Sequence, residues 1–173
     1  MADALLGNYS PESVVVVLSK GEFVHTIQGY ADGTFLNVSR ITPASELYVG
    51  SDLSAGRVKR RNKAATITLT LHQFSTSNAV LQALQRADEE DDTDTWVFAL
   101  TAKDTSGTTL FSSNQAFIAT VPDTTLSNTT ETRDWVFQAV SLSYNVGSNT
   151  KFDAAEVAAM NAVGATVPAR WQL

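Results

Sequence analysis

The chain has no cysteine, two histidines and few charged side chains, which make up 17% of its 173 residues. The absence of cysteine excludes disulfides, thiolate metal sites and a cysteine nucleophile. The low charge argues against a coiled coil or charge-rich helical bundle. The apolar run Val14–Leu18 is far shorter than the roughly 20 residues that span a bilayer. Because the first residues also lack a signal-peptide pattern, we expect a soluble protein made in the cytoplasm, with no membrane contact.

Hydrophobic residues make up 43% of the chain, which is enough for a core, and 21 Thr and 16 Ser accompany them. Chains that are rich in Thr and other β-branched residues usually fold as antiparallel sheet. The net charge of −6 and the pI near 4.8 argue against a general nucleic-acid binder. The composition therefore predicts a mainly β protein.

Alternation of apolar and polar residues predicts most of the strands. We expect strands over 13–19, 23–28, 34–40, 46–49, 65–72, 95–103, 108–111, 115–121 and 133–146. The last of these changes its apolar phase midway, which predicts a bulge or bend near Ala139. The clearest strand, 65–72, has an apolar face and a polar face, formed respectively by Ala65, Ile67, Leu69 and Leu71 and by Thr66, Thr68, Thr70 and His72.

Helical spacing is evident in two places. Ser75–Ser77 can cap a helix that continues to about Ala87, with an apolar stripe formed by Val80, Leu81, Leu84 and Ala87. An Ala-rich stretch over 152–163 predicts a short helix near the end of the chain. We expect a single domain over 1–173, with a long loop or extended hairpin at about 42–62 and a C-terminal arm at about 150–173.

Charge is concentrated in two segments of opposite sign. The long loop ends in a basic cluster formed by Arg57, Lys59, Arg60, Arg61 and Lys63. The predicted helix runs into the acidic segment Asp88–Asp94. This segment is best explained as a solvated connection, with an acidic patch for a basic partner as an alternative. A calcium loop is a further alternative, although the segment lacks the Gly and the terminal Glu of an EF-hand loop. The basic cluster has no aromatic residue for stacking on bases. One basic and one acidic segment in the same chain can pair head to tail between copies.

Residues with catalytic potential form no recognisable motif. His25 and His72 lie in expected strands without a second histidine at metal-binding spacing. The sequence contains no nucleophile elbow, phosphate-binding loop or dinucleotide fingerprint. We therefore expect no enzymatic activity, catalytic residue, cofactor or metal.

The order of several segments resembles a known family. These segments are 29–35 (GYADGTF), 57–62, 66–71 (TITLTL), 75–81 (STSNAVL), 103–110 (KDTSGTTL), 116–119 (AFIA) and 132–137 (TRDWVF). In order and spacing they resemble the tail tube proteins of contractile-tailed bacteriophages, which are also similar to type VI secretion tube proteins. The similarity runs from about Tyr9 to about Val146.

The resemblance implies two packed antiparallel sheets or a distorted barrel, with a flanking helix. It implies a virion protein whose copies form stacked hexameric rings inside a contractile sheath, as the conduit for genome ejection. Four strands per subunit would join a β-barrel around the lumen, and DNA would pass without specific binding. The implied partners are other copies, the sheath, the tape measure protein, the baseplate hub and the tail terminator.

The resemblance gives the singled-out residues assembly roles. The basic cluster is then a candidate contact between rings or between subunits. The candidate lumen wall is the polar face formed by Thr66, Thr68, Thr70 and His72. The alternative is that this polar face lies on the outside of the assembly and faces solvent. Glu89, Glu90, Asp91 and Asp92 become candidates for the outer surface or a sheath contact.

Other functions stay open at this point. One alternative is the inner tube of a phage-derived contractile injection particle, a bacteriocin. Another is a β-sandwich binding module for carbohydrate or a surface receptor, which would need exposed aromatic platforms, whereas Trp96 and Trp135 are expected on apolar strand faces. An enzyme with a dispersed site is the last alternative.

Overall fold

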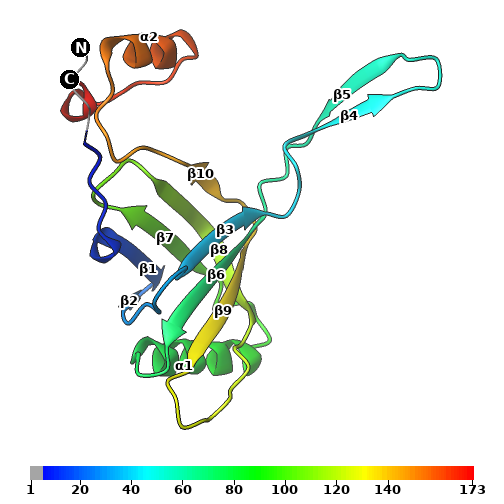
Figure 1. Ribbon diagram of the computed structural model, residues 1–173. Coiled ribbons are helices and arrows are strands. Elements are labelled where there is room, and N and C mark those ends of the chain that lie inside the picture. The colour runs from blue at the N-terminus through cyan, green and yellow to red at the C-terminus, as the bar shows by residue number, and fades with distance from the viewer. Residues whose placement is uncertain (1–5) are drawn as a thin grey trace.

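The computed structural model describes residues 6–173 and consists mainly of antiparallel strands (Figure 1). The strands are β1 (Val14–Lys20), β2 (Phe23–Thr26), β3 (Leu36–Arg40), β4 (Ser45–Val49), β5 (Ala55–Lys59), β6 (Ala65–His72), β7 (Phe98–Asp104), β8 (Leu110–Thr120), β9 (Thr132–Ala139) and β10 (Ser143–Asn145). The helices are α1 (Ser77–Glu89) and α2 (Ala154–Ala162), with short 3₁₀ turns at Pro11–Ser13 and Ala169–Trp171. None of the helices in this part of the chain is long and apolar enough to cross a membrane.

The two antiparallel sheets that the resemblance implies are present. The larger sheet has the strand order β2-β1-β7-β8-β9-β6-β3, and β10 pairs with β8 beside it. The smaller sheet is the hairpin β4-β5, which projects from one end of the body rather than lying across the larger sheet (Figure 1). Within the described residues the large sheet ends at β2 and β3 and does not close into a barrel. The expected mainly β fold with a flanking helix and a short C-terminal helix is confirmed.

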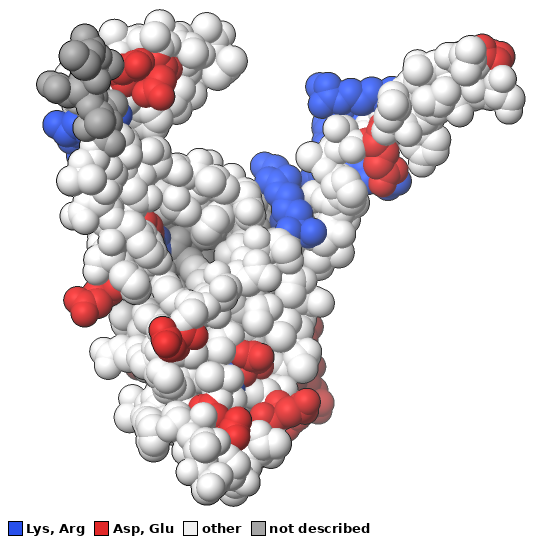
Figure 2. Space-filling model, in the orientation of Figure 1, with Lys and Arg blue, Asp and Glu red and all other residues white. Residues whose placement is uncertain are grey.

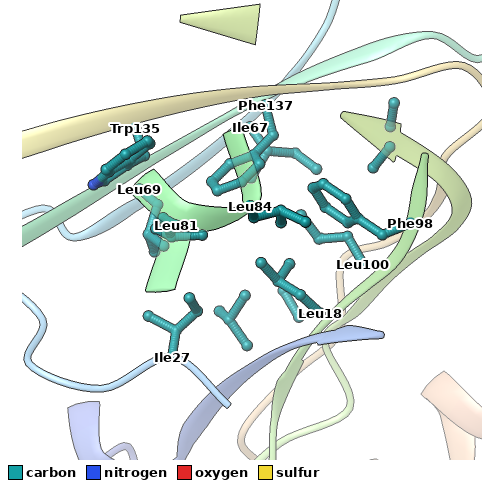
Figure 3. Packing of buried hydrophobic residues seen from close by; sticks show 14 of the residues in the cluster. Leu18, Ile27, Ile67, Leu69, Leu81, Leu84, Phe98, Leu100, Trp135 and Phe137 are labelled. Carbon is teal, nitrogen blue, oxygen red and sulfur yellow. The ribbon is translucent and has the colours of Figure 1, made fainter. Parts of the chain in front are cut away.

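The core lies between the curled sheet and α1. Alternate residues of β6 are fully buried, and the aromatic rings of Phe98 and Phe137 meet edge to face with centroids 6.1 Å apart. Leu81 and Leu84 of α1 point into the same cluster (Figure 3). The indole Nε1 of Trp135 donates to Asn78 Oδ1 at 2.9 Å and so joins β9 to α1. The predicted stripe of α1 is only half buried, since Val80 and Ala87 remain partly exposed.

Several predicted boundaries differ from the structure. The strands expected at 108–111 and 115–121 form one strand, β8. It pairs with β7 on one side and with β9 and β10 on the other. These hydrogen bonds keep residues 112–114 extended, although their polar side chains locally favour a turn. The strand expected over 133–146 is instead β9 followed by β10, both along β8, and the chain bends between them where Leu142 turns into the core. The expected bend near Ala139 is thus confirmed.

Helix α1 continues into the acidic segment, where the sequence predicted that it would stop. The C-terminal residue Glu89 lies beyond the expected end at about Ala87. These carboxylates are largely exposed, so water screens the unfavourable helix dipole. The strand β7 begins at Phe98 rather than Thr95, which leaves Trp96 outside the sheet.

Candidate functional site

The predicted long loop is an extended hairpin with exposed side chains on both faces. The β4–β5 register pairs Leu47 with Arg57 and Val49 with Ala55, so these residues share one face with Lys59. Tyr48 and Val58 lie on the other face. An isolated two-stranded hairpin is marginally stable in water. Its exposed apolar residues therefore indicate a surface that another molecule covers.

The basic cluster divides between the two faces of this hairpin. Arg60 donates to Glu46 Oε2 at 2.8 Å, and this hydrogen bond lowers the pKa of the Glu46 carboxyl. Arg57 and Lys59 lie on the opposite face and, within the described residues, have no carboxylate within 4.0 Å. Arg61 and Lys63 follow in the exposed connection to β6. The predicted contact residues thus follow one another on β5 and in the connection to β6, and blue side chains gather along this part of the hairpin and at its base (Figure 2).

The tip of the hairpin presents a leucine in an unusual backbone conformation. Leu53 has φ of 64° and is 84% exposed. Asp52 stabilises the turn by accepting from the amide and hydroxyl of Ser54, and the hydroxyl hydrogen bond lowers the pKa of Asp52. Non-glycine residues in the left-handed region are strained and are often found at functional positions.

The predicted polar face of β6 is partly exposed and continues onto its neighbours. Thr66 faces Ser39 of β3 and Gln138 of β9, and Thr68 faces Asn37 and Val136. Asp134 is the one charged residue that the register of β3, β6 and β9 places on this face, within the described strands. The Nδ1 atom of His72, at the end of β6, is buried and has no hydrogen-bond partner among residues 6–173. The face is therefore broad, polar and nearly uncharged.

The acidic segment after α1 forms a compact turn. The carboxylate of Asp91 accepts from the amides of Thr93 and Thr95 and from the Thr93 hydroxyl, and the side-chain hydrogen bonds lower its pKa to about 2. Glu89, Glu90 and Asp92 are exposed around it. For the calcium alternative, the described residues contain no cluster of three or more potential metal ligands. Asp91 thus holds the turn together, and its neighbours give the turn its negative surface.

A buried carboxylate that sequence reasoning did not single out joins three segments. Asp104 is 7% exposed and accepts from the Ser13 hydroxyl (2.8 Å), the Ser106 amide (2.8 Å) and Asn149 Nδ2 (2.6 Å). Burial by itself would raise the pKa of Asp104, but the hydrogen bonds from Ser106, Asn149 and Ser13 outweigh it and lower the pKa. The sequence signal for this site is the Asp-x-Ser pattern in a turn, because an Asp side chain often accepts a hydrogen bond from the backbone amide two residues further on. Asp104 therefore ties the start of β1 and the C-terminal arm to the β7–β8 turn.

We expect Asp104→Ala to lower the free energy of unfolding by about 2–3 kcal/mol at pH 7, because it leaves several buried donors without an acceptor. The pKa is lowered in the folded state, so the carboxylate stabilises the fold above its unfolded pKa of about 3.9 and this contribution is lost as the pH falls through the folded value. Urea unfolding of both proteins at pH 7 and near pH 3 measures the difference. If the difference in unfolding free energy between the two proteins were no smaller near pH 3 than at pH 7, this explanation would be contradicted.

His25 contacts a buried hydroxyl group. His25 Nε2 lies 3.0 Å from the Ser77 hydroxyl oxygen, which also accepts from the Gln28 amide. Ser77 is fully buried at the start of α1. Burial lowers the pKa of His25. This pair fastens β2 to α1.

Comparison with known proteins gives three concordant findings. Residues 12–147 match the model of the family described as Bacteriophage PhiTE tail tube protein. A curated relative, "Structural protein ORF10" of Pseudomonas phage KPP10, is 33% identical over 165 residues, which cover 94% of this chain and 95% of that protein. A solved structure, the anti-feeding prophage cap (AFP tube terminating cap), has a similar fold with a TM-score of 0.53 and 15% identity, over 84% of this chain and 97% of that one.

The family match covers nearly the same span as the expected resemblance, from about Tyr9 to about Val146. The resemblance to phage tail tube proteins is therefore confirmed, and the chain is a phage structural protein by relationship. The family match extends over most of the chain, from the first turn before β1 to the end of β10. The chain belongs to the Bacteriophage PhiTE tail tube protein family.

Proposed function

We propose that this chain is a non-enzymatic subunit of a phage tail tube, whose copies form stacked hexameric rings inside a contractile sheath. The tube would be the conduit for genome ejection in the virion, after synthesis in the host cytoplasm. The observation that carries the proposal is the projecting β4–β5 hairpin in a member of a tail tube family, because its exposed apolar residues need a partner surface. The phage origin of the 33% identical relative favours a phage tail over the bacteriocin alternative.

The ring would close through the strands that carry the polar face. Strands β8, β9, β6 and β3 are consecutive in the sheet, which agrees with the expected four lumen strands per subunit. Among the strands of residues 6–173, the last residues of β8, from Phe117 to Thr120, pair only with β9, since the pairing with β7 ends at Ala116. In the same part of the chain, strand β3 pairs only with β6. Exposed strand edges invite pairing between chains, so joining these two edges would extend the sheet around a ring.

The face of Thr66, Thr68, Thr70 and His72 is our candidate for the lumen wall. In the described strands β3, β6 and β9 the register places no lysine or arginine on this face. A wall without positive charge would not retain DNA by neutralising its phosphates. Passing DNA would therefore meet mainly hydroxyl and amide groups, with the carboxylate of Asp134 among them, and would not be bound specifically.

The remaining partners follow from the tube itself. A tube of defined length needs a tape measure protein inside it, a baseplate hub at one end and a terminator at the other. The acidic turn of Glu89, Glu90, Asp91 and Asp92 has two proposed partners, a sheath subunit or the basic hairpin of another copy.

Negative-stain electron microscopy of the purified full-length chain at high concentration tests the proposal. We expect rings or tubes with a central hole, and in a reconstruction of them the threonines of β6 should line that hole. A protein that remains monomeric at all concentrations, even with baseplate present as a nucleus, would overturn the proposal.

A further inference from the structure

An apolar groove lies beside α1, between the helix, Phe23 of β2 and Trp96. It has a volume of about 420 Å³ and is lined by Phe23, Ala79, Val80, Ala83, Leu84, Ala87 and Trp96. Ala79, Ala83 and Ala87 recur every four residues, so small side chains form the floor along the helix. Neither a charged residue nor a hydroxyl is among the groove residues. Such a surface favours an apolar occupant that comes close to the helix backbone.

The acidic turn connects two residues of this groove. Ala87 immediately precedes Asp88, and Trp96 follows the turn after Asp94 and Thr95. An occupant of this groove would thus meet apolar side chains along the helix and then carboxylates where the helix ends. The occupant should carry the same order of surfaces, with apolar residues followed by positive charge.

The β4–β5 hairpin has this order on one of its faces. From the tip toward the base, the face presents Val49 beside Ala55, then Leu47 beside Arg57, then Ser45 beside Lys59. Val49 is 59% and Leu47 72% exposed. The opposite face lacks this pattern because its cation, Arg60, is already paired with Glu46.

The spacing of the two surfaces also agrees. One step along the register, from Val49 to Leu47, covers about 7 Å, because a strand rises about 3.3 Å per residue. The four residues from Ala83 to Ala87 cover about 6 Å of helix at 1.5 Å per residue. With Val49 over Ala83, Arg57 therefore reaches the level of Ala87, and Lys59 reaches the acidic turn.

The two surfaces lie at opposite ends of the subunit. Figure 1 shows α1 across one end of the sheet and the hairpin projecting from the other. Figure 2 shows blue side chains at the base of the hairpin and red ones gathered at the α1 end. The contact is therefore impossible within one subunit, but it can repeat indefinitely between copies as a heterologous contact.

We propose that the groove on α1 receives the β4–β5 hairpin of a copy in the next ring, with Arg57 and Lys59 against the acidic turn. The inference rests on the proposed function, since it names the receiving site for a contact between rings. It assigns the acidic turn to another copy of the chain rather than to the sheath.

The absence of cysteine from the chain allows a direct test by disulfide formation. The test variant combines Val49→Cys with Ala83→Cys, and the matched control combines Tyr48→Cys with Ala83→Cys. Tyr48 is adjacent and equally exposed, at 56%, but lies on the opposite face. Under oxidising conditions we expect a ladder of covalent multimers from assembled test protein, which reducing agent abolishes, and little cross-linking of the control.

The outcomes separate this inference from the proposed function. If tubes form but the test variant stays monomeric on a denaturing gel, or cross-links no more than the control, the groove has a different occupant and the inference is overturned. If the unmodified chain forms no rings or tubes, both the proposed function and the inference fail.

Charge exchange provides a second measurement that does not depend on cysteines. We expect Lys59→Glu to raise the concentration needed for assembly by about tenfold, and Lys59→Glu combined with Asp92→Lys to restore it in part. Lys151 lies outside the hairpin, so the control variant Lys151→Glu should leave the concentration needed for assembly unchanged. The absence of any rescue by the double variant would count against the acidic turn as the partner.

Discussion

Replacing residues 42–63 by Asn-Gly is expected to give a subunit that folds but no longer forms tubes. The hairpin contributes no residue to the hydrophobic core, and the one ion pair that it makes with the described residues, Arg60 with Glu46, is internal to it. Ile41 donates its amide to the Ala64 carbonyl at 3.1 Å, so the ends that the turn must join already lie side by side. Asn-Gly is the preferred two-residue turn between such strands.

The free energy of unfolding should therefore change by only about 1 kcal/mol, since changes to exposed segments away from the core are mild. Assembly should be lost, because the deleted residues carry every apolar and basic group that the hairpin offers to a second copy. Circular dichroism and thermal unfolding measure the fold, and electron microscopy with sedimentation measures the tubes. Normal tubes from the shortened chain would refute the role of the hairpin, and loss of folding would mean that it belongs to the core.

A milder variant separates the charge from the apolar contact. Neutralising Arg57 and Lys59 as serines should weaken stacking and reduce its dependence on salt, because screened ion pairs lose strength as the ionic strength rises. The same change at Arg60 should have a smaller effect, since Arg60 is already paired with Glu46. If the serine substitutions at Arg57, Lys59 and Arg60 weakened stacking equally, the cause would be the overall charge of the hairpin and not a contact made by one of its faces.

Local alternation was sufficient to predict the strands that are buried on one face only. The bounds of β6 agree with the prediction because its apolar residues, such as Ile67 and Leu69, alternate strictly with threonines. Prediction was poorer where pairing with neighbours overrides local preference, as in β8, whose polar middle is held by strands on both sides. Sequence periodicity does not contain that information, since the neighbours come from distant parts of the chain.

The candidate site was predicted in part for a similar reason. The charges of Arg57 and Lys59 are visible in the sequence, and the family resemblance gave them an assembly role. The hairpin register places Glu46, the ion-pair partner of Arg60, on one face and Arg57 on the other, and this register depends on a turn whose length the sequence does not specify. The groove on α1 was missed because Ala83 and Ala87 resemble ordinary helix residues, and because Trp96 was expected on the buried face of a strand.

The two tryptophans that the sequence assigned to apolar strand faces should respond to mutation in opposite ways. Trp135 is 2% exposed and its Nε1 donates to Asn78, so Trp135→Ala removes core volume and leaves a side-chain amide without its partner. We expect a loss of about 3–5 kcal/mol in the free energy of unfolding, a large share of the roughly 5–15 kcal/mol that holds a typical domain together. Trp135→Phe keeps much of the volume and should cost less.

Trp96 is half buried, packs against the edge of the core and lines the groove outside β7, so Trp96→Ala should cost about 2 kcal/mol of stability, less than Trp135→Ala. Its larger effect should be on assembly, because the mutation removes one wall of the site that we assign to the hairpin of another copy. Urea unfolding followed by circular dichroism gives the stability of each variant, and sedimentation gives the fraction in tubes. If Trp96→Ala destabilised the subunit as strongly as Trp135→Ala, Trp96 would belong to the core and the groove would not be a preformed surface.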